Sequence, residues 1–180
     1  MKGMVFTEFL EMVETTWSLD MVDGVIARAG VGGAYTAVGT YPHAELVALV
    51  TALAEITGQP PPVLLQVFGR HLFGRFVQAY GRFFEGVPDS LTFLAGIEDI
   101  IHAEVRKLYP DAELPSFAVE RQPGRLVMTY YSRHPQPDLA LGLIEGCLAH
   151  FNDGAAVHLE DLPPGSGAQA RFVVEAGEAP

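Results

Sequence analysis

Residues 89–110 limit the fold most, because they combine a helix start, an apolar face and a helix stop. Ser90 is predicted to cap this helix by accepting a hydrogen bond from an early backbone amide. Pro110 cannot continue a helix, so we expect the helix to end near Leu108 or Tyr109. Apolar residues at helical spacing predict one buried stripe, made of Leu94, Ile97, Ile101, Val105 and Leu108.

A histidine lies at the margin of this stripe. His102 follows the same edge of the helical wheel as Glu98, so its imidazole can point inward. The helix alone leaves two interpretations of His102 open: a half-buried histidine with a backbone partner, or a metal ligand. Glu98 and Asp99 have no histidine partners at metal-binding spacing, and we interpret this acid pair as part of a solvated face.

The composition favours one domain and excludes several classes of partner. With 180 residues, 49% of them hydrophobic, the chain can bury one sizeable core without needing a second. A net charge of −11 repels phosphate backbones, which argues against a nucleic-acid partner. Apolar runs are shorter than the roughly 20 residues of a membrane helix, and Glu8 interrupts any secretory signal. We therefore expect a cytoplasmic protein without a membrane partner.

The order of patterns along the chain predicts an α+β fold. Helices are expected at residues 5–16, 18–29, 43–57 and from 60 to about 80 or 84, followed by the helix at 89–110. Alternating strands are expected at 116–121 and 125–132, then a helix at 137–152 and strands near 157–162 and 170–175. This order predicts an N-terminal helical subdomain followed by an antiparallel sheet with an inserted helix. Residues 1–175 should form a single domain and residues 176–180 a frayed tail.

The sequence carries few signatures of enzymes. It has no Gly-x-Ser-x-Gly elbow and no phosphate loop, and Gly30, Gly32 and Gly33 follow a predicted helix rather than a strand. Cys147 is the single cysteine, so neither an internal disulfide nor a thiolate zinc cage can form. The six histidines never reach a His-x-x-x-His spacing. A lone histidine remains, which is what a haem iron requires as its axial ligand.

From residue 1 to residue 146 the chain resembles the bacterial haem nitric oxide/oxygen binding (H-NOX) family, to which the haem domain of soluble guanylate cyclase is related. The features that carry the resemblance are the Met1-Lys2-Gly3 opening, His102 before the sheet, Pro115 after a short loop, Tyr130-x-Ser132, and Leu-Gly-Leu-Ile-Glu-Gly at 141–146. The resemblance implies a ligand pocket between the helical part and the sheet part. It also implies haem b as the cofactor.

The resemblance also implies roles for individual residues. His102 matches the histidine that binds the haem iron, and Pro115 matches the proline that presses on the macrocycle and distorts it. Tyr130 and Ser132 match the first two members of the family's Tyr-x-Ser-x-Arg motif, which binds the haem propionates. His134 stands where the motif has its arginine, and Arg133 comes one place early.

The missing arginine leaves three interpretations. Imidazole replaces a planar guanidinium poorly, because the guanidinium grips a carboxylate through two parallel hydrogen bonds. Pro135 could twist the backbone so that Arg133 reaches the propionates, or protonated His134 could serve together with Glu45. The third interpretation is that propionate binding has been lost.

The distal side of the pocket bears on ligand choice. Oxygen-binding relatives place a tyrosine where this chain has Leu139, and Leu72 roughly matches a second polar distal position. Bound oxygen gains from a hydrogen-bond donor, whereas nitric oxide and carbon monoxide need it less. An apolar wall should then favour nitric oxide and carbon monoxide over oxygen; we expect it to contain Phe9, Leu72, Leu139 and Leu143. The same residues are also compatible with plain core packing.

The resemblance implies a stand-alone gas sensor that performs no chemistry itself. Nitric oxide would weaken or break the bond between iron and His102, and the change would pass to a separate histidine kinase or diguanylate cyclase. The alternative is a haem-free relative that binds an apolar small molecule or acts only as an interaction module. A haem enzyme that uses peroxide is a third hypothesis, and it requires His71 to face the iron.

Overall fold

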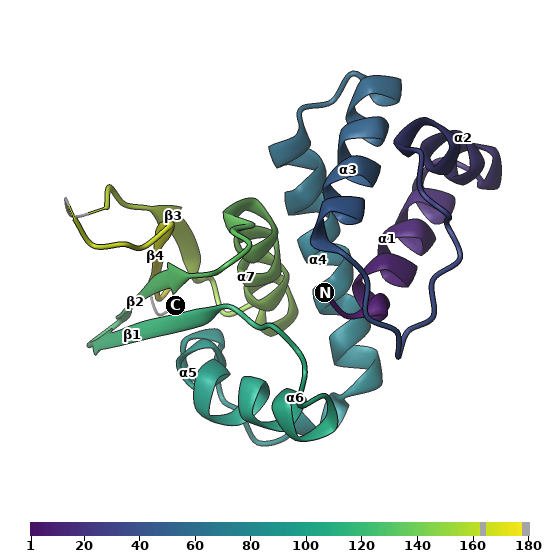
Figure 1. Cartoon of the computed structure of the whole chain (residues 1–180). Coiled ribbons are helices and arrows are strands. Elements are labelled where there is room, and N and C mark those ends of the chain that lie inside the picture. The colour runs from purple at the N-terminus through teal and green to yellow at the C-terminus, as the bar shows by residue number, and fades with distance from the viewer. Residues whose placement is uncertain (163–164, 178–180) are drawn as a thin grey trace.

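Four helices form the N-terminal part of the computed structural model, which describes residues 1–162 and 165–177, with the side chain of Leu108 excepted. Ser18 accepts a hydrogen bond from the Met21 N–H and so starts the second helix, which ends at Gly30 with a φ of 65°. Gly58, with a φ of 70°, ends the third helix. The four helices are α1 (Gly3–Thr16), α2 (Leu19–Ala29), α3 (His43–Thr57) and α4 (Pro61–Ala79), and we call them together the helical lobe (Figure 1).

Residues 89–110 form three helical pieces, so the prediction of one continuous helix is wrong. After a short 3₁₀ turn, η1 (Gly81–Phe83), come α5 (Ser90–Ala95), the π-helix η2 (Ile97–His102) and α6 (Ala103–Leu108). The predicted end near Leu108 is confirmed. The predicted capping residue is one position off, because the Asp89 carboxylate accepts from the Thr92 N–H at 2.7 Å. Ser90 instead donates its own N–H to Asp153, at 2.7 Å.

An antiparallel sheet follows α6. Its strands are β1 (Ser116–Gln122), β2 (Arg125–Tyr131), β3 (Ala156–Leu159) and β4 (Ala170–Glu175), in the order β1-β2-β4-β3. Gln122 pairs with Arg125 across a tight hairpin in which Gly124 has a φ of 68°. Helix α7 (Pro137–Phe151) is inserted between β2 and β3, as predicted, whereas β3 ends at Leu159, earlier than expected. We call residues 84–162 and 165–177 the sheet lobe.

The predicted C-terminal tail is only partly within the described residues. Ala176 still donates its N–H to the Gly124 carbonyl at 2.8 Å, while residues 178–180 lie outside them. None of the described helices is long and apolar enough to cross a membrane.

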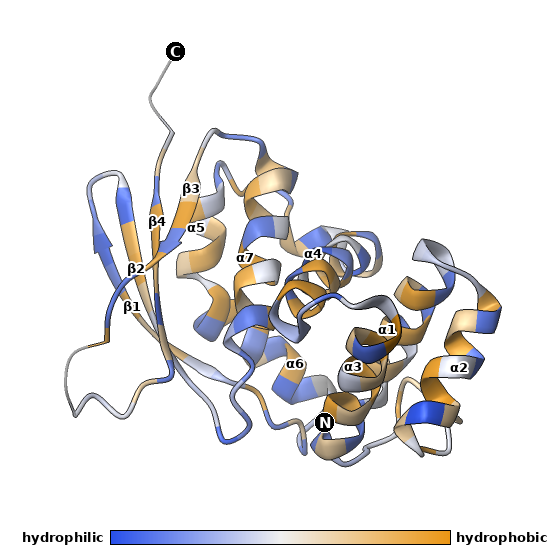
Figure 2. Ribbon diagram, turned by 90° about the horizontal axis from the view of Figure 1, so that it is seen from above, coloured by the Kyte–Doolittle hydropathy of each residue, from blue (hydrophilic) through white to orange (hydrophobic). Residues whose placement is uncertain are grey.

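Helices α4 and α7 join the two lobes. Helix α7 lies between the sheet and α4 in Figure 1, and apolar ribbon segments of α4 and α7 face one another in Figure 2. Glycines allow the close approach: a Cβ at Gly69 would lie 2.5 Å from the Leu139 carbonyl oxygen, and one at Gly142 would lie 2.2 Å from that of Gln66. Each lobe has its own apolar core. The α+β class is confirmed, and the junction of the lobes contains the cavity described next.

Candidate functional site

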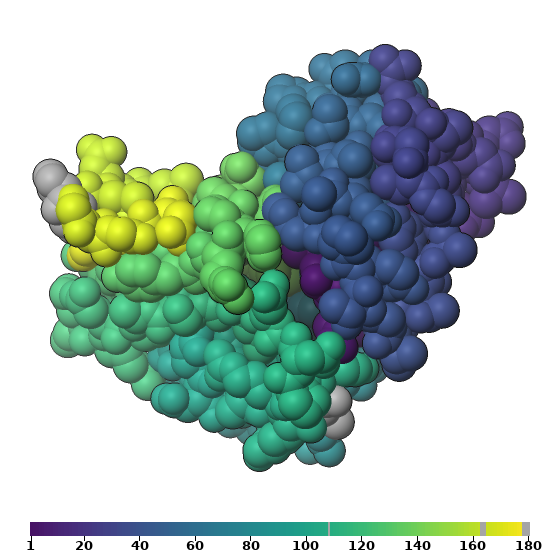
Figure 3. Space-filling model, viewed as in Figure 1, coloured from purple at the N-terminus to yellow at the C-terminus, as the bar shows by residue number. Residues whose placement is uncertain are grey.

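A cavity of about 470 Å³ lies between the helical lobe and the sheet lobe. Figure 3 shows a hollow between the blue helical lobe and the green segments, with N-terminal residues in purple inside it. The volume falls within the range of about 300–1,000 Å³ that is common for small-molecule and cofactor sites. Most of the lining is apolar, and it includes Met4, Val5, Leu72, Phe76, Ile97, Ile101, Leu114, Leu139 and Leu143.

His102 lines this cavity at the last position of the π-helix η2. Only 8% of the residue is exposed. Its Nδ1 lies 2.9 Å from Glu98 Oε1, which leaves Nε2 as the ring nitrogen available to a ligand. Burial lowers the pKa of His102, although the nearby Glu98 carboxylate opposes this effect. A buried neutral imidazole with one uncommitted nitrogen is suited to bind a metal.

Glu98 is a site residue that sequence reasoning missed. The structure contradicts the solvated-face interpretation for this residue, because its Oε1 also accepts the N–H of Phe117 at 2.9 Å. The spacing of four residues between Glu98 and His102 was a usable signal, since such pairs lie close on a helix. The contact with Phe117 is not visible in the sequence because it depends on where β1 packs.

Three of the four predicted distal residues line the cavity. Leu72 comes from α4, and Leu139 and Leu143 come from α7. Phe9 does not line it; its ring packs edge to face against Phe68 in the helical lobe, with centroids 5.2 Å apart. Phe9 belongs instead to the apolar core cluster that also contains Leu72 and Leu139.

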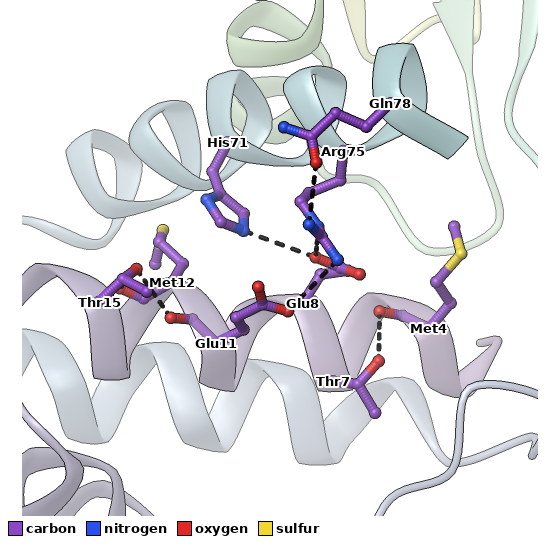
Figure 4. Close-up of polar contacts among 9 residues, drawn as sticks. All are labelled: Met4, Thr7, Glu8, Glu11, Met12, Thr15, His71, Arg75 and Gln78. Atoms are coloured by element: carbon purple, nitrogen blue, oxygen red, sulfur yellow. Dashed lines mark hydrogen bonds and ion pairs between the residues drawn. The ribbon is translucent and has the colours of Figure 1, made fainter. Parts of the chain in front are cut away.

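His71 is turned away from the cavity. Figure 4 shows its ring directed toward α1, where Nε2 lies 3.6 Å from Glu8 Oε2. Arg75 donates to the same oxygen at 2.8 Å, so Glu8 ties α1 to α4. His71 is not among the residues that line the cavity. The peroxide hypothesis needed this histidine inside, and the structure gives it no such position.

The residues of the Tyr-x-Ser run reach the same cavity. Tyr130, Ser132, Arg133 and His134 all line it. The Tyr130 hydroxyl accepts the N–H of Gln136 at 3.1 Å, which leaves the hydroxyl proton to be donated elsewhere. Ser132 Oγ accepts the N–H of His134 at 3.2 Å.

Glu113 contacts both His134, which stands at the position of the missing arginine, and Arg133, the residue before it. Arg133 Nη1 lies 3.2 Å and His134 Nε2 lies 3.5 Å from its carboxylate oxygens. Glu45, the other group considered as a partner of His134, accepts the hydroxyl of Tyr35 at 2.8 Å, and a joint role of His134 and Glu45 stays a prediction. In a strand, the side chains of Arg133 and His134 would point to opposite faces. Strand β2 ends at Tyr131, so this alternation does not apply to them.

Pro115 also lines the cavity, in the loop between α6 and β1. It precedes Phe117 by two residues, and the Phe117 ring lies 6.2 Å from that of His102, centroid to centroid. The largely apolar cavity is therefore lined by the buried imidazole of His102 and the rigid ring of Pro115. Its lining also contains hydrogen-bond donors that can bind a carboxylate, on Tyr130, Ser132 and Arg133.

A family model described as Haem-NO-binding matches residues 2–159. The chain belongs to this family. Members of the H-NOX family bind haem and are sensor domains rather than enzymes. No curated protein matches the chain.

Solved H-NOX structures share the fold over almost the whole chain. The Fe(II) unliganded H-NOX protein from K. algicida is 37% identical, with a TM-score of 0.90 over 99% of this chain and 98% of that one. The H-NOX from Shewanella woodyi in the Fe(II)CO state is 32% identical, with a TM-score of 0.84 over 98% and 95%. An H-NOX protein from S. oneidensis in the Fe(II)NO state shows the same fold at 22% identity, with a TM-score of 0.87 over 99% and 100%.

The cavity residues fit a haem group. A haem is a largely apolar disc with two acidic side chains and one iron, and the cavity offers apolar walls, donors and the buried imidazole of His102. Cys147, by contrast, lies buried outside the lining, and burial raises the pKa of its thiol. This thiol behaves as a small hydrophobic group.

Proposed function

We propose that this H-NOX domain is a sensor of nitric oxide and carbon monoxide that holds haem b through His102. The single observation that carries the proposal is the buried imidazole of His102, with Nδ1 engaged and Nε2 uncommitted, in the wall of an apolar cavity. Haem held there would supply an iron centre for gas binding, and His102 would be the protein ligand of that iron.

The proposed roles of the other residues follow from their positions. Pro115 presents a rigid ring to the cavity and resists a flat cofactor. Tyr130 and Ser132 offer hydroxyls to the acidic side chains of the cofactor, together with Arg133 and His134. Binding of the cofactor's carboxylates by Arg133 or His134 must compete with Glu113, which already contacts both residues.

Selectivity is proposed to come from the distal wall. Leu72, Leu139 and Leu143 carry no hydrogen-bond donor, so they cannot stabilise the negative charge that oxygen develops on iron. Nitric oxide and carbon monoxide depend less on such a donor. Movement of the helical lobe against the sheet lobe is then proposed to change contact with a separate histidine kinase or diguanylate cyclase. The predicted cytoplasmic location stays a prediction.

Glu113 favours one alternative. Its carboxylate contacts both Arg133 and His134, so the positive charge that Arg133 brings to the cavity lining is compensated. A haem-free relative that binds an apolar molecule is therefore the second candidate.

Visible absorption spectra of the reduced protein separate these candidates. Protein expressed with ample haem should show a Soret band that shifts with nitric oxide and with carbon monoxide but not with air. The absence of any Soret band supports the haem-free alternative. A stable oxygen complex contradicts the proposed selectivity. The partner class is tested by adding the protein, with and without nitric oxide, to a purified kinase or cyclase from the same organism; an unchanged enzyme rate contradicts it.

A further inference from the structure

The carboxylate of Glu98 has three donors around it. Its Oε1 lies 2.9 Å from His102 Nδ1 and accepts the Phe117 N–H at 2.9 Å, and its Oε2 lies 3.5 Å from Arg106 Nη2. The Glu98 side chain is only 23% exposed. Burying a carboxylate costs free energy unless donors satisfy it, and these three groups do so.

The contact determines which ring nitrogen of His102 carries the proton. An ionised carboxylate accepts hydrogen bonds and cannot donate them. The neutral ring must therefore carry its proton on Nδ1, which places the lone pair on Nε2. Carboxylates that accept from a metal-binding histidine fix its tautomer and ring orientation and raise its basicity.

The same oxygen also connects His102 to the sheet. Phe117 belongs to β1, two residues after Pro115, whereas Glu98 and His102 belong to η2. The orientation of the imidazole is thus tied to the strand that continues from the proline. A tilt of the ring must disturb the Glu98 contact, the Phe117 contact or both.

We infer that Glu98 is a positioning residue that holds His102 as a strongly donating ligand with Nε2 toward the cavity and links the ring to β1. This inference rests on the proposed haem-binding function. The chain would thus have a carboxylate–histidine pair that strengthens the hold of His102 on the iron of a bound haem.

The first test compares Glu98→Gln and Glu98→Ala with the wild-type chain, all loaded with haem. Asp99→Asn is the matched control, because it removes the same charge from the exposed neighbouring residue. Resonance Raman spectra of the ferrous proteins report the iron–histidine stretching frequency. We expect it to fall in E98Q, which keeps an acceptor but loses the charge, to fall further in E98A, and to stay unchanged in D99N. Haem affinity of E98A should be weaker by about 10- to 100-fold.

A merely structural role gives a different result. If Glu98 only fastens η2 to β1, E98A lowers the melting temperature while the iron–histidine frequency stays at its wild-type value. That outcome contradicts the inference.

The second test uses ¹⁵N NMR of the histidine rings in the haem-free full chain, with His102→Gln to assign the signals. His102 should carry its proton on Nδ1 alone in the wild type and exchange between both tautomers in E98A. If haem does not bind the wild-type chain, the proposed function fails, and this spectrum still decides the Glu98 contact. If haem binds and E98A changes neither spectrum, the inference fails by itself.

Discussion

The imidazole of His134 stacks on the imidazole of His43, with ring centroids 4.9 Å apart and 16° between the ring planes. His43 begins α3, and its Nε2 lies 2.7 Å from Nε2 of Gln136. This stack therefore brings the position of the missing arginine against the helical lobe. Burial lowers the pKa of His43, and the neighbouring His134 lowers it further.

The lowered pKa of His43 predicts a loss of stability in acid. Below the ordinary histidine pKa of about 6.5 the unfolded chain binds a proton that the folded chain resists, so protonation favours unfolding. His43→Phe keeps a ring for His134 but cannot ionise. The wild type should therefore lose more unfolding free energy than H43F between about pH 7.5 and about pH 5.5. Denaturant unfolding at both pH values measures this, with exposed His158→Gln as the control; equal losses in wild type and H43F contradict the prediction.

The close packing of α4 on α7 predicts opposite effects at two glycines of α4. Gly69→Ala places a Cβ against the backbone of Leu139 and Gly142, which cannot move without shifting α7. We expect a loss of about 1–3 kcal/mol in the free energy of unfolding. Outside its own helix backbone, no described atom lies within 4 Å of the Cβ position of Gly74, so Gly74→Ala should stabilise by about 0.5–1 kcal/mol. Urea unfolding measures both free energies. If Gly69→Ala and Gly74→Ala change the free energy of unfolding equally, α4 and α7 do not pack as closely as the structure shows.

The lowered pKa of Asp153 predicts a second contact that is lost in acid. Burial alone would raise the pKa of its carboxyl, but hydrogen bonds from the Ser90 and Ala155 N–H groups more than offset burial and lower the pKa. Its stabilising contribution is complete above the unfolded pKa of about 3.9 and disappears as pH falls through the lower folded value. Asp153→Asn should cost about 1–2 kcal/mol at neutral pH. Thermal unfolding should show that the stability difference between the wild type and Asp153→Asn becomes smaller in acid. A stability difference that grows in acid contradicts the lowered pKa of Asp153.

The apolar distal wall predicts a gain of oxygen binding on one substitution. Leu139 lines the cavity from α7, so Leu139→Tyr brings a hydroxyl donor to that wall. A donor stabilises the charge on bound oxygen by about 1.5–3 kcal/mol, which corresponds to roughly 10- to 150-fold in affinity. Oxygen titration of the reduced protein measures this. Leu139→Phe, which adds the ring without the hydroxyl, is the control, and an equal gain in the phenylalanine variant excludes the hydrogen bond as the cause.

Local rules predicted the helices whose ends carry their own signals. Ser18 and Gly30 enclose α2, and Gly58 ends α3, so the residues at these boundaries are sufficient to place them. Alternation predicted the strands on both sides of Gly124, and the positive φ of this glycine fits the tight turn between them. Family resemblance then indicated His102, Tyr130 and Ser132, and the cavity contains all three.

The π-helix and the partners of the site residues depend on tertiary contacts. A 3.6-residue wheel cannot show that the turn at Ile97–His102 is wider than an α-helix, although such turns often occur at functional sites. The contacts of Glu98 with Phe117 and of Glu113 with His134 depend on the path of the loops between them, which the sequence does not reveal. Phe9 has the right spacing and residue type for the wall, but α1 turns it toward Phe68.

The central claim is that His102 holds the iron of a haem in this cavity. His102→Gly should remove the ligand and leave a space into which free imidazole fits. Haem-loaded, reduced H102G protein should lose the wild-type Soret band, and added imidazole should restore its position. A Soret band in H102G that already matches the wild type, and that imidazole does not change, contradicts the account.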